Sequence, residues 1–282
     1  MKKVKISAVV VVYHPQIEQL KDNLSNYDKM VSHIIVVDNS EDTMCKQHLL
    51  ALCKEKRYKY IDMFGNKGIA LALNIGIHNI ISTGDCDWVL TMDQDSCFQT
   101  DITGFTDFIK MCADIKEYIF LAPSYSYNSH VAQVNDKILY PRFVWQSGCL
   151  IQICNYLKLG PYLDKLFIDY VDYEYCLRAR KNGFKFAQLT SVVLKHNPGE
   201  PQDASFLGFK YQYHSSFPIR HYYYVRNGLY VIFRYKSFRC IYFLLKSILK
   251  VLFIENDKKS KIHFMSKGML DFKENRYGRF SD

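Results

Sequence analysis

The sequence has no long run of apolar residues. None of its apolar stretches reaches the roughly eighteen residues that cross a bilayer, and the best candidate, residues 241–254, is interrupted by Lys246 and Lys250. The short apolar run near the start ends at His14 and Pro15, and no small-residue cleavage site follows, so it is better interpreted as a buried strand than as a secretory leader. We therefore expect a cytoplasmic chain without a transmembrane segment.

Paired cysteines and the common glycine motifs for nucleotides are also missing. The nine Cys are scattered without a C-x-x-C pair or a zinc-ligand spacing, which favours buried thiols in a reducing compartment. No G-x-G-x-x-G follows the first predicted strand and no P-loop occurs, so dinucleotide binding and Walker-type phosphate binding are unsupported. With 282 residues, 49% hydrophobic and 23% charged, the chain is a globular protein of one large or two small domains.

The positive charge is concentrated near the C-terminal end. Residues 234–282 carry twelve Lys and Arg against five Asp and Glu, a net charge of +7, whereas residues 1–233 carry only +2 of the total of +9. This asymmetry indicates a local anionic partner. It argues against a nucleic acid bound along the whole surface, and no nucleic-acid recognition motif is present.

Hydrophobic patterning in the first half predicts an α/β fold. Residues 6–13 and 34–37 are continuous apolar runs typical of buried strands, and residues 17–30 between them carry apolar side chains at helical spacing. This order is typical of a parallel βαβ unit. Further strands are predicted over 59–64, 88–92, 120–123, 149–154 and 191–194, and helices over 68–81 and 105–114. We therefore expect a doubly wound α/β domain.

Polar residues follow several of the predicted strands. His14 follows the first strand, Asp38 the second, and Asp93 and Asp95 the fourth. Ligands of an open parallel sheet bind outside the carboxyl ends of its strands, so we expect these side chains to converge on one edge. Two carboxylates two residues apart suit Mg²⁺ or Mn²⁺, particularly when a diphosphate supplies the other oxygens. Carboxylates after a strand also commonly serve as caps or turn formers.

Two groups of charged residues stand out in the second half. Asp169, Asp172 and Glu174 lead into a predicted helix, and three acids exceed what helix capping needs. On a later predicted helix, a spacing of three residues places Arg220, Tyr223 and Arg226 on one face. The arginines suit a diphosphate, either of a soluble ligand or of a lipid-linked one, and surface packing of cations on aromatic rings is the alternative.

Taken together, eight short segments resemble the inverting glycosyltransferases of family 2 and, within them, the bacterial rhamnosyltransferase branch. The segments are residues 9–15, 36–40, 66–70, 91–96, 146–151, 167–178, 196–200 and 220–227. The resemblance implies a GT-A fold, a Rossmann-like mixed sheet flanked by helices that binds a nucleotide sugar. It also implies a basic helical C-terminal extension, residues 234–282, that follows a glycosyltransferase domain of residues 1–233.

The resemblance also implies roles for individual residues at the donor. Tyr13 and Pro15 would flank the nucleobase, and Asp38 would hydrogen-bond it. Asp93 would contact the ribose or the metal, and Asp95 would bind the metal that bridges the diphosphate, with His196 as an additional metal or phosphate contact. The residues expected against the rest of the donor are Asn66, Lys67, Gly68, Ser147 and Gly148. Each of these two loops also has a purely structural alternative. Residues 66–68 could serve only to start a helix, and residues 147–148 could serve only as the turn before a strand.

The general base implied by the resemblance is the Asp of an acidic pair that leads a helix. That position is Asp172, and because Val171 stands where the family usually has Glu, Asp169 stays an alternative. If Asp172 is the base, Asp169 would bind substrate. The base would take the proton from an acceptor hydroxyl as this hydroxyl attacks the anomeric carbon on the face opposite the diphosphate.

The implied reaction is a metal-dependent transfer, with Mg²⁺ or Mn²⁺, of L-rhamnose from dTDP-rhamnose to a glycan or lipid-linked glycan of a bacterial surface polysaccharide such as O-antigen or capsule. A UDP-hexose donor, glucose or galactose, is the alternative within the same chemistry. A non-catalytic nucleotide-sugar-binding protein is disfavoured, because both metal carboxylates and the base are present.

The basic extension contains an amphipathic stretch. Its predicted helical stripe is formed by Ile241, Leu244, Leu245, Ile248, Val251 and Leu252, while Arg239, Lys246 and Lys250 lie off it. Such a stripe most often packs on its own protein. Together with the charge and aromatic flanks, it also fits a helix lying in an anionic membrane surface, so we expect peripheral contact with the inner face of the cytoplasmic membrane and no nucleic-acid partner.

Overall fold

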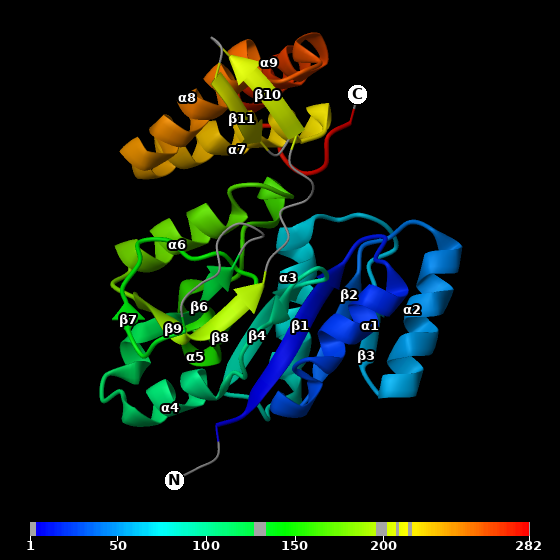
Figure 1. Ribbon diagram of the computed structural model, residues 1–282, viewed down its shortest axis with the longest axis vertical. Coiled ribbons are helices and arrows are strands. Elements are labelled where there is room, and N and C mark those ends of the chain that lie inside the picture. Colours follow the sequence, from blue (N-terminus) through cyan, green and yellow to red (C-terminus); the bar gives the residue numbers. More distant parts are fainter. Residues whose placement is uncertain (1–3, 127–133, 196–201, 207–208, 214–215, 282) are drawn as a thin grey trace. The chain divides into compact units, whose positions relative to one another are not determined.

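The computed structural model describes residues 4–126, 134–195, 202–206, 209–213 and 216–281 (Figure 1). The chain forms two compact units, which we call the sheet unit (Met1–Tyr162 and Tyr175–Asn197) and the helical unit (Leu163–Glu174 and Pro198–Asp282). The expected division at residue 233 into a catalytic domain and an extension concerns function and stays a prediction.

One mixed sheet organises the sheet unit. Among the described residues its strands are β1 (Ile6–Val12), β2 (Ile34–Asp38), β3 (Lys59–Asp62), β4 (Trp88–Asp93), β5 (Cys97–Phe98), β6 (Tyr118–Ser126), β7 (Ile138–Leu139), β8 (Cys149–Gln152) and β9 (Lys185–Lys195). Their order is β3-β2-β1-β4-β8-β6-β9-β5, with β7 also paired to β9. The β3-β2-β1-β4 half is parallel, as the βαβ pattern predicts, and β8 runs antiparallel to both of its neighbours.

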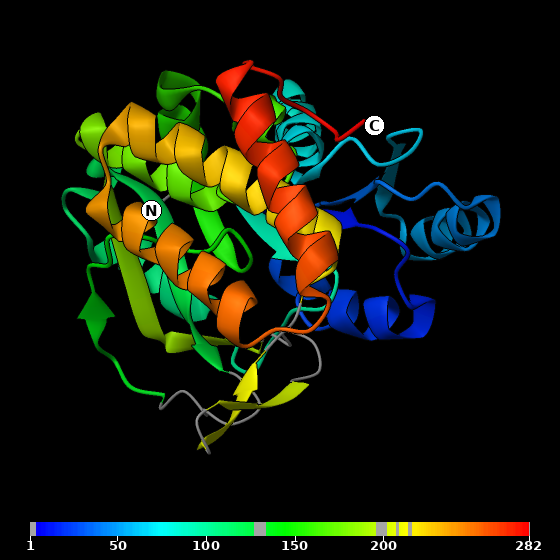
Figure 2. The ribbon, with the colours of Figure 1, turned by 90° about the horizontal axis from the view of Figure 1, so that it is seen from above.

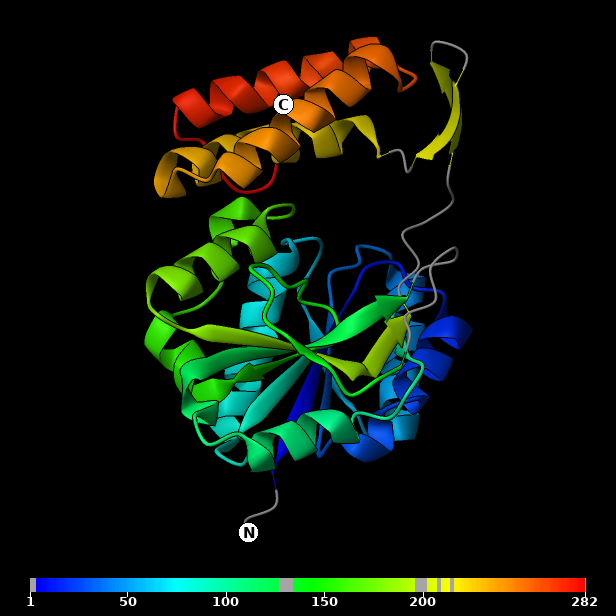
Figure 3. The same ribbon diagram turned by 60° about the vertical axis from the view of Figure 1, so that its left-hand side comes forward.

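Helices pack on both faces of this sheet (Figure 3). They are α1 (Ile17–Ser25), α2 (Thr43–Lys56), α3 (Ile69–Thr83), α4 (Thr103–Met111), α5 (Ile153–Leu159) and the greater part of α6 (Val171–Lys181), with short 3-10 turns η1 (Asp28–Met30) and η2 (Ile115–Glu117). Side chains alternate between faces along a strand. Val10 accordingly packs with Leu20 of α1, whereas Val9 faces α3. A Cβ at Gly76 of α3 would lie 2.4 Å from Val9 Cγ1, so glycine permits this close approach.

The helical unit is built around three helices, α7 (Pro218–Tyr235), α8 (Phe238–Phe253) and α9 (Lys258–Lys273), which run from yellow to red in Figure 2. It also contains the 3-10 turn η3 (Asp164–Leu166), the first turn of α6, and the antiparallel hairpin of β10 (Gln202–Phe206) and β11 (Phe209–Tyr213). Gly268 of α9 lies against α7, where an added Cβ would be 2.4 Å from the Tyr222 carbonyl oxygen. This contact explains how α7 and α9 pack so closely.

The predicted apolar stripe on α8 divides between the protein and the solvent. Leu244 and Val251 are buried in a small core with Val225 of α7 and Met265 of α9. Ile241, Leu245 and Leu252 are exposed instead. The predicted stripe is therefore divided lengthwise, with one edge in the core of the helical unit and the other edge exposed.

Two further sequence expectations can be compared with the structure. All nine Cys lie within the described ranges, and none of them forms a disulfide bond. Within the described ranges, no helix is long and apolar enough to cross a membrane.

Candidate functional site

The loop after β1 is held by a side chain that follows β4. Gln94 accepts a hydrogen bond from the backbone N–H of Tyr13 through Oε1 (2.7 Å) and donates one to the Tyr13 carbonyl through Nε2 (3.2 Å). The backbone of His14 adopts a left-handed conformation, with φ of 46°, and the Tyr13 ring is 45% exposed. Gln94 therefore holds the backbone of Tyr13, the residue predicted to flank the nucleobase, in place. Sequence reasoning missed this role, although Gln94 lies between the two predicted metal ligands.

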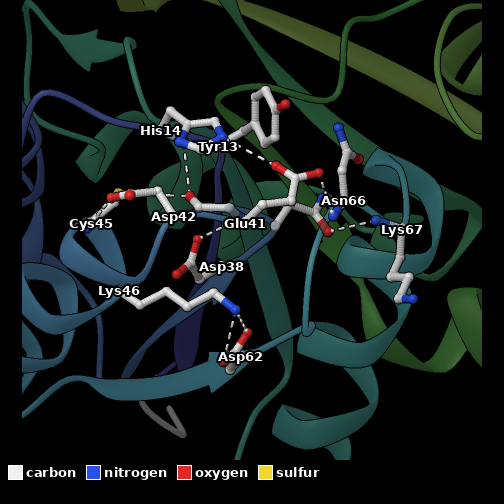
Figure 4. Close-up of polar contacts among 12 residues, drawn as sticks. Tyr13, His14, Asp38, Glu41, Asp42, Cys45, Lys46, Asp62, Asn66 and Lys67 are labelled. Carbon is white, nitrogen blue, oxygen red and sulfur yellow. Dashed lines mark hydrogen bonds and ion pairs between the residues drawn. The ribbon is translucent and has the colours of Figure 1, made fainter.

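The loops after β2 and β3 are tied together at the same edge (Figure 4). Asn39 accepts from the Lys67 N–H through Oδ1 (3.2 Å) and donates to the Gly68 carbonyl through Nδ2 (3.3 Å). Glu41 accepts from the Asn66 N–H (3.2 Å), and its other oxygen lies 3.1 Å from His14 Nε2. The structure thus brings residues 66–68 next to the loop after β1. Glu41 was not predicted, and nothing in its sequence context distinguishes it from a surface acid.

Asp38 is fully buried at the end of β2. Its Oδ1 accepts from the Ser40 N–H and its Oδ2 accepts from the Tyr60 hydroxyl, both at 2.8 Å. Burial, together with the Asp38 carboxylate, raises the pKa of Tyr60, so this hydroxyl stays protonated and donates. Both oxygens of Asp38 therefore already accept hydrogen bonds from the protein. The nucleobase contact predicted for Asp38 stays a prediction, and it requires these bonds to be shared or exchanged.

The end of β4 is joined to the turn before β8. Gln146 donates to Asp93 Oδ1, while Ser147 Oγ accepts from the Asp93 N–H (3.1 Å) and donates to Ser96 Oγ (3.0 Å). Gly148 has a left-handed backbone, with φ of 79°, and a Cβ there would lie 2.8 Å from Leu194 Cδ2. Gly148 is therefore required by the fold itself, and Ser147 has a structural function whether or not it lies near a sugar.

Asp93 and Asp95 are the described carboxylates best suited to a divalent cation. Both are half-buried at the end of β4, and in the described part of the chain Asp95 makes no hydrogen bond or ion pair. Elsewhere among the described residues, no group of three or more His, Cys, Asp or Glu could hold a metal. The two carboxylates fit an ion that takes its other oxygens from a diphosphate. The predicted ligand His196 lies outside the described residues.

The predicted catalytic loop belongs to the helical unit and has an unusual backbone. Phe167, Asp169 and Tyr170 all adopt positive φ angles, of 65°, 61° and 61°. Such conformations are unfavourable for residues other than glycine and concentrate at functional sites. The buried side chain of Asn227 supports the loop, since its Nδ2 donates to the carbonyls of Leu166 and Ile168, both at 2.7 Å, and to that of Asp169 at 3.1 Å.

The three acids of this region differ in their surroundings. Asp169 forms a two-point ion pair with Arg220, whose Nε lies 3.3 Å from Oδ2 and whose second contact joins Nη2 to Oδ1. Glu174 is buried and accepts from the Tyr235 hydroxyl at 2.5 Å. Asp172 is half-buried in the first turn of α6. The choice between Asp172 and Asp169 as the general base stays a prediction.

Tyr223 and Arg226 lie inside the helical unit, in contrast to Arg220, whose side chain is 47% exposed. The Arg226 guanidinium is fully buried and donates to the carbonyls of Leu166 (3.3 Å) and Gly278 (2.8 Å). Tyr223 stacks on Phe167 with ring centroids 5.0 Å apart. Both side chains contact the loop that precedes α6, and the substrate contacts predicted for them stay predictions.

Comparison with known proteins gives the family and the fold. Residues 7–148 match the sequence model of Glycosyl transferase family 2. The chain is 25% identical over 291 residues to "dTDP-rhamnosyl transferase RfbF" of Shigella flexneri, an alignment that covers 94% of this chain and 93% of that protein.

Two solved structures share the fold. The structure of GalNAc-T7 with UDP, GalNAc and Mn²⁺ has a TM-score of 0.58 at 12% identity, covering 97% of this chain and 58% of that one. Residues 1–349 of S. aureus TarS give a TM-score of 0.51 at 13% identity, covering 97% and 73%. The chain thus spans less than two thirds of the GalNAc-T7 chain. These likenesses confirm the predicted fold, a mixed sheet flanked by helices.

Proposed function

Because this chain belongs to glycosyl transferase family 2, and is thus a glycosyltransferase, we propose that it transfers L-rhamnose from dTDP-rhamnose to an acceptor hydroxyl. The acceptor is a glycan or lipid-linked glycan of a bacterial surface polysaccharide, and the anomeric configuration is inverted. The observation that carries the donor assignment is the alignment with the Shigella flexneri protein over nearly the whole length of both chains.

The donor nucleotide binds at the edge of the sheet formed by the loops after β1, β2, β3 and β4. The exposed ring of Tyr13 packs on the base, and Gln94 keeps the backbone beneath this ring in place. The Lys67 side chain is exposed and, within the described ranges, forms no ion pair, which leaves its ammonium group available to a phosphate. Asn39 and Glu41 support this segment through its backbone.

Asp93 and Asp95 would hold Mg²⁺ or Mn²⁺ together with the donor diphosphate. When bound, the cation neutralises charge on the departing nucleoside diphosphate, as a Lewis acid does. Gln146 and Ser147 fix Asp93 through its carboxylate and its N–H, so the orientation of this ligand is set before the donor arrives. Asp95 offers its carboxylate without first breaking a contact to another described residue.

Asp172 is the general base in this proposal. The acceptor oxygen attacks the anomeric carbon while its proton passes to the Asp172 carboxylate. The bond from that carbon to the diphosphate oxygen breaks, and its electron pair leaves with dTDP. Asp169 is held in its ion pair with Arg220. Arg226, Asn227 and Tyr223 position the loop that precedes the base, as their contacts to residues 166–169 indicate.

We also propose that the helical unit binds peripherally to the cytoplasmic face of a membrane. Five exposed apolar side chains of α8 lie at positions i, i+4, i+7, i+11 and i+14 of a single face, namely Phe238, Tyr242, Leu245, Leu249 and Leu252. Arg239, Lys246 and Lys250 lie beside that face. An apolar face next to cations suits an anionic bilayer surface, where a lipid-linked acceptor would be found.

A panel of donors tests the proposed activity. The purified chain is mixed with dTDP-rhamnose, UDP-glucose or UDP-galactose, with and without Mg²⁺ or Mn²⁺, and both the melting temperature and the release of nucleoside diphosphate are measured. We expect metal-dependent stabilisation and dTDP release with dTDP-rhamnose. Stabilisation by a UDP-hexose alone would overturn the rhamnose assignment. Binding of a donor without any turnover, even with lipid-linked acceptor extracts, would contradict catalysis.

A further inference from the structure

The helical unit contains a cavity of about 290 Å³ between the start of α7 and the middle of α8. Arg220 and His221 line it from α7, and Lys246 and Lys250 line it from α8. Sites for drug-sized ligands measure about 300–1,000 Å³. This cavity is therefore matched to a small group such as a phosphate or diphosphate and is small for a whole nucleotide sugar.

Positive charge exceeds negative charge around this cavity. Arg220 is paired with Asp169, but Glu255, the other acid of the lining, is shared between Lys250 (2.7 Å) and Lys261 (2.6 Å). Lys246 is exposed at the mouth and, in the part of the chain that the structure describes, has no ion-pair or hydrogen-bond partner. The lining thus has three permanent cations, Arg220, Lys246 and Lys250, against two carboxylates. Lys261, which is not part of the lining, pairs with Glu255 as a further cation, and this balance favours an anionic ligand.

A buried polar atom in the lining also lacks a hydrogen bond within the described part of the chain. His221 is only 5% exposed, and its Nε2 lies 3.4 Å from Glu255 Oε2 without forming a hydrogen bond to any described residue. Buried polar atoms are nearly always hydrogen-bonded, because an unsatisfied one costs about 1–3 kcal/mol. A ligand oxygen in the cavity would satisfy the imidazole.

The cavity adjoins the apolar face of α8. Lys246 follows Tyr242 by four residues and precedes Leu249 by three, so both exposed apolar side chains are its neighbours on the helix surface. An amphiphile with its chain along this apolar face would therefore present its head group to Lys246 and Lys250. Free phosphate and the donor nucleotide carry no lipid chain that would pack on this neighbouring apolar surface.

We propose that this cavity binds the diphosphate of the lipid-linked acceptor. The lipid source rests on the proposed function, whereas binding of the phosphate group rests on the cavity alone. The ion pairs of Arg220 with Asp169 and of Lys250 with Glu255 stay intact. Lys246 and His221 bind the phosphate oxygens, and the lipid chain covers the apolar face of α8. The helical unit thus recognises the carrier of the acceptor sugar.

Two pairs of variants of the full chain test the phosphate site. Lys246→Gln removes a cation of the lining and Ser247→Asp adds a carboxylate to it, whereas Lys259→Gln and Ser266→Asp make the same changes on the exposed surface of α9. Calorimetric titration with inorganic pyrophosphate should show binding to the wild type. We expect about fivefold weaker binding for Lys246→Gln, the effect of one partly screened charge at about 4 Å, and still weaker binding for Ser247→Asp. Equal affinities for cavity and control variants, or no binding to the wild type, would overturn the site.

A second titration identifies the source of the diphosphate. Farnesyl diphosphate, which carries the same group on an isoprenoid chain, should bind the wild type at least tenfold more tightly than pyrophosphate. Leu249→Glu, which places a charge on the apolar face, should remove that advantage. Equal binding of the two probes would overturn the lipid source. Binding of dTDP, measured in parallel, should be unchanged in every variant. If the wild type does not bind dTDP, this result would count against the proposed donor without affecting the result for pyrophosphate.

Discussion

Asn227 offers the sharpest test of how the catalytic loop is held. Its side-chain amide has two hydrogens and lies within hydrogen-bond distance of three carbonyls, those of Leu166, Ile168 and Asp169. Arg226 also donates to the Leu166 carbonyl. In Asn227→Ala, the carbonyls of Ile168 and Asp169 therefore lose this donor at the point where the backbone is left-handed. We expect the loop to relax and Asp172, the proposed base, to lose its orientation.

The magnitude follows from these contacts. Loss of one hydrogen bond to a buried group costs about 1–2 kcal/mol, so the two hydrogens of the amide correspond to about 2–4 kcal/mol of unfolding free energy. For a protein of this size, each kcal/mol lowers the melting temperature by about 2–4 °C. The turnover number should fall by at least tenfold, because a displaced base forfeits part of the roughly 10²–10⁴-fold that general base catalysis supplies.

Asn155 is a matched control in the sheet unit. It is equally buried, and its Nδ2 donates to the carbonyls of Lys116 (2.8 Å) and Tyr118 (2.9 Å) and to Gln152 Oε1 (2.6 Å). Asn155→Ala should lose similar stability in urea unfolding, yet keep its turnover number when assayed well below its melting temperature. If both variants lose turnover equally, the reasoning that Asn227 positions the base is refuted.

The other predictions concern the base, the metal, one buried acid and the exposed face of α8. Asp172→Asn should leave donor binding intact and lower transfer by about 10²–10⁴-fold, and a larger loss in Asp169→Asn would instead make Asp169 the base. Asp95→Ala should abolish the metal dependence of donor binding in a thermal-shift assay, and unchanged dependence would contradict its role. The pKa of Glu255 is held at about 2, because its close contacts with His221, Lys250 and Lys261 outweigh the effect of burial, which would raise it. This lowered pKa adds stability above the unfolded-state pKa of about 4.5, worth about 3 kcal/mol, and the gain disappears as the pH falls from 4.5 toward 2. The difference in unfolding free energy between the wild type and Glu255→Gln should shrink over that interval, and a difference independent of pH would exclude this account. Leu249→Glu should reduce sedimentation with phosphatidylglycerol vesicles, with circular dichroism as the folding control.

The sheet could be predicted from the sequence because its strands carry strong local signals. The β-branched runs of β1 and β2 are buried on both faces, and such runs have few alternative structures. Helix α2 was missed because its few buried side chains give weak periodicity, although Asp42 caps it by accepting from the Cys45 N–H (2.6 Å). An acid followed by a run of good helix formers was the available signal.

The candidate site could be predicted only where residues come directly after a strand. Asp38 and Asp93 were found because they end buried strands at one edge of the sheet. Gln94 and Glu41 support the same edge through side-chain contacts to the backbone of other loops. Such contacts join positions far apart in the chain and leave no periodic pattern. For the same reason, no sequence pattern indicates that Arg226 is buried and supports the loop that ends near Asp169.

Helix α8 shows where periodicity alone is insufficient. Its apolar residues cover well over half of the helix circumference, so the sequence cannot say which side packs inward. The structure separates Leu244, which is buried against α7 and α9, from Leu249, which is 53% exposed. A glutamate at Leu244 would remove core packing and should unfold the helical unit, whereas one at Leu249 should leave the fold intact. If Leu249→Glu also unfolds the unit, this face is part of the protein's own interior, and the reasoning that places it against a lipid surface fails.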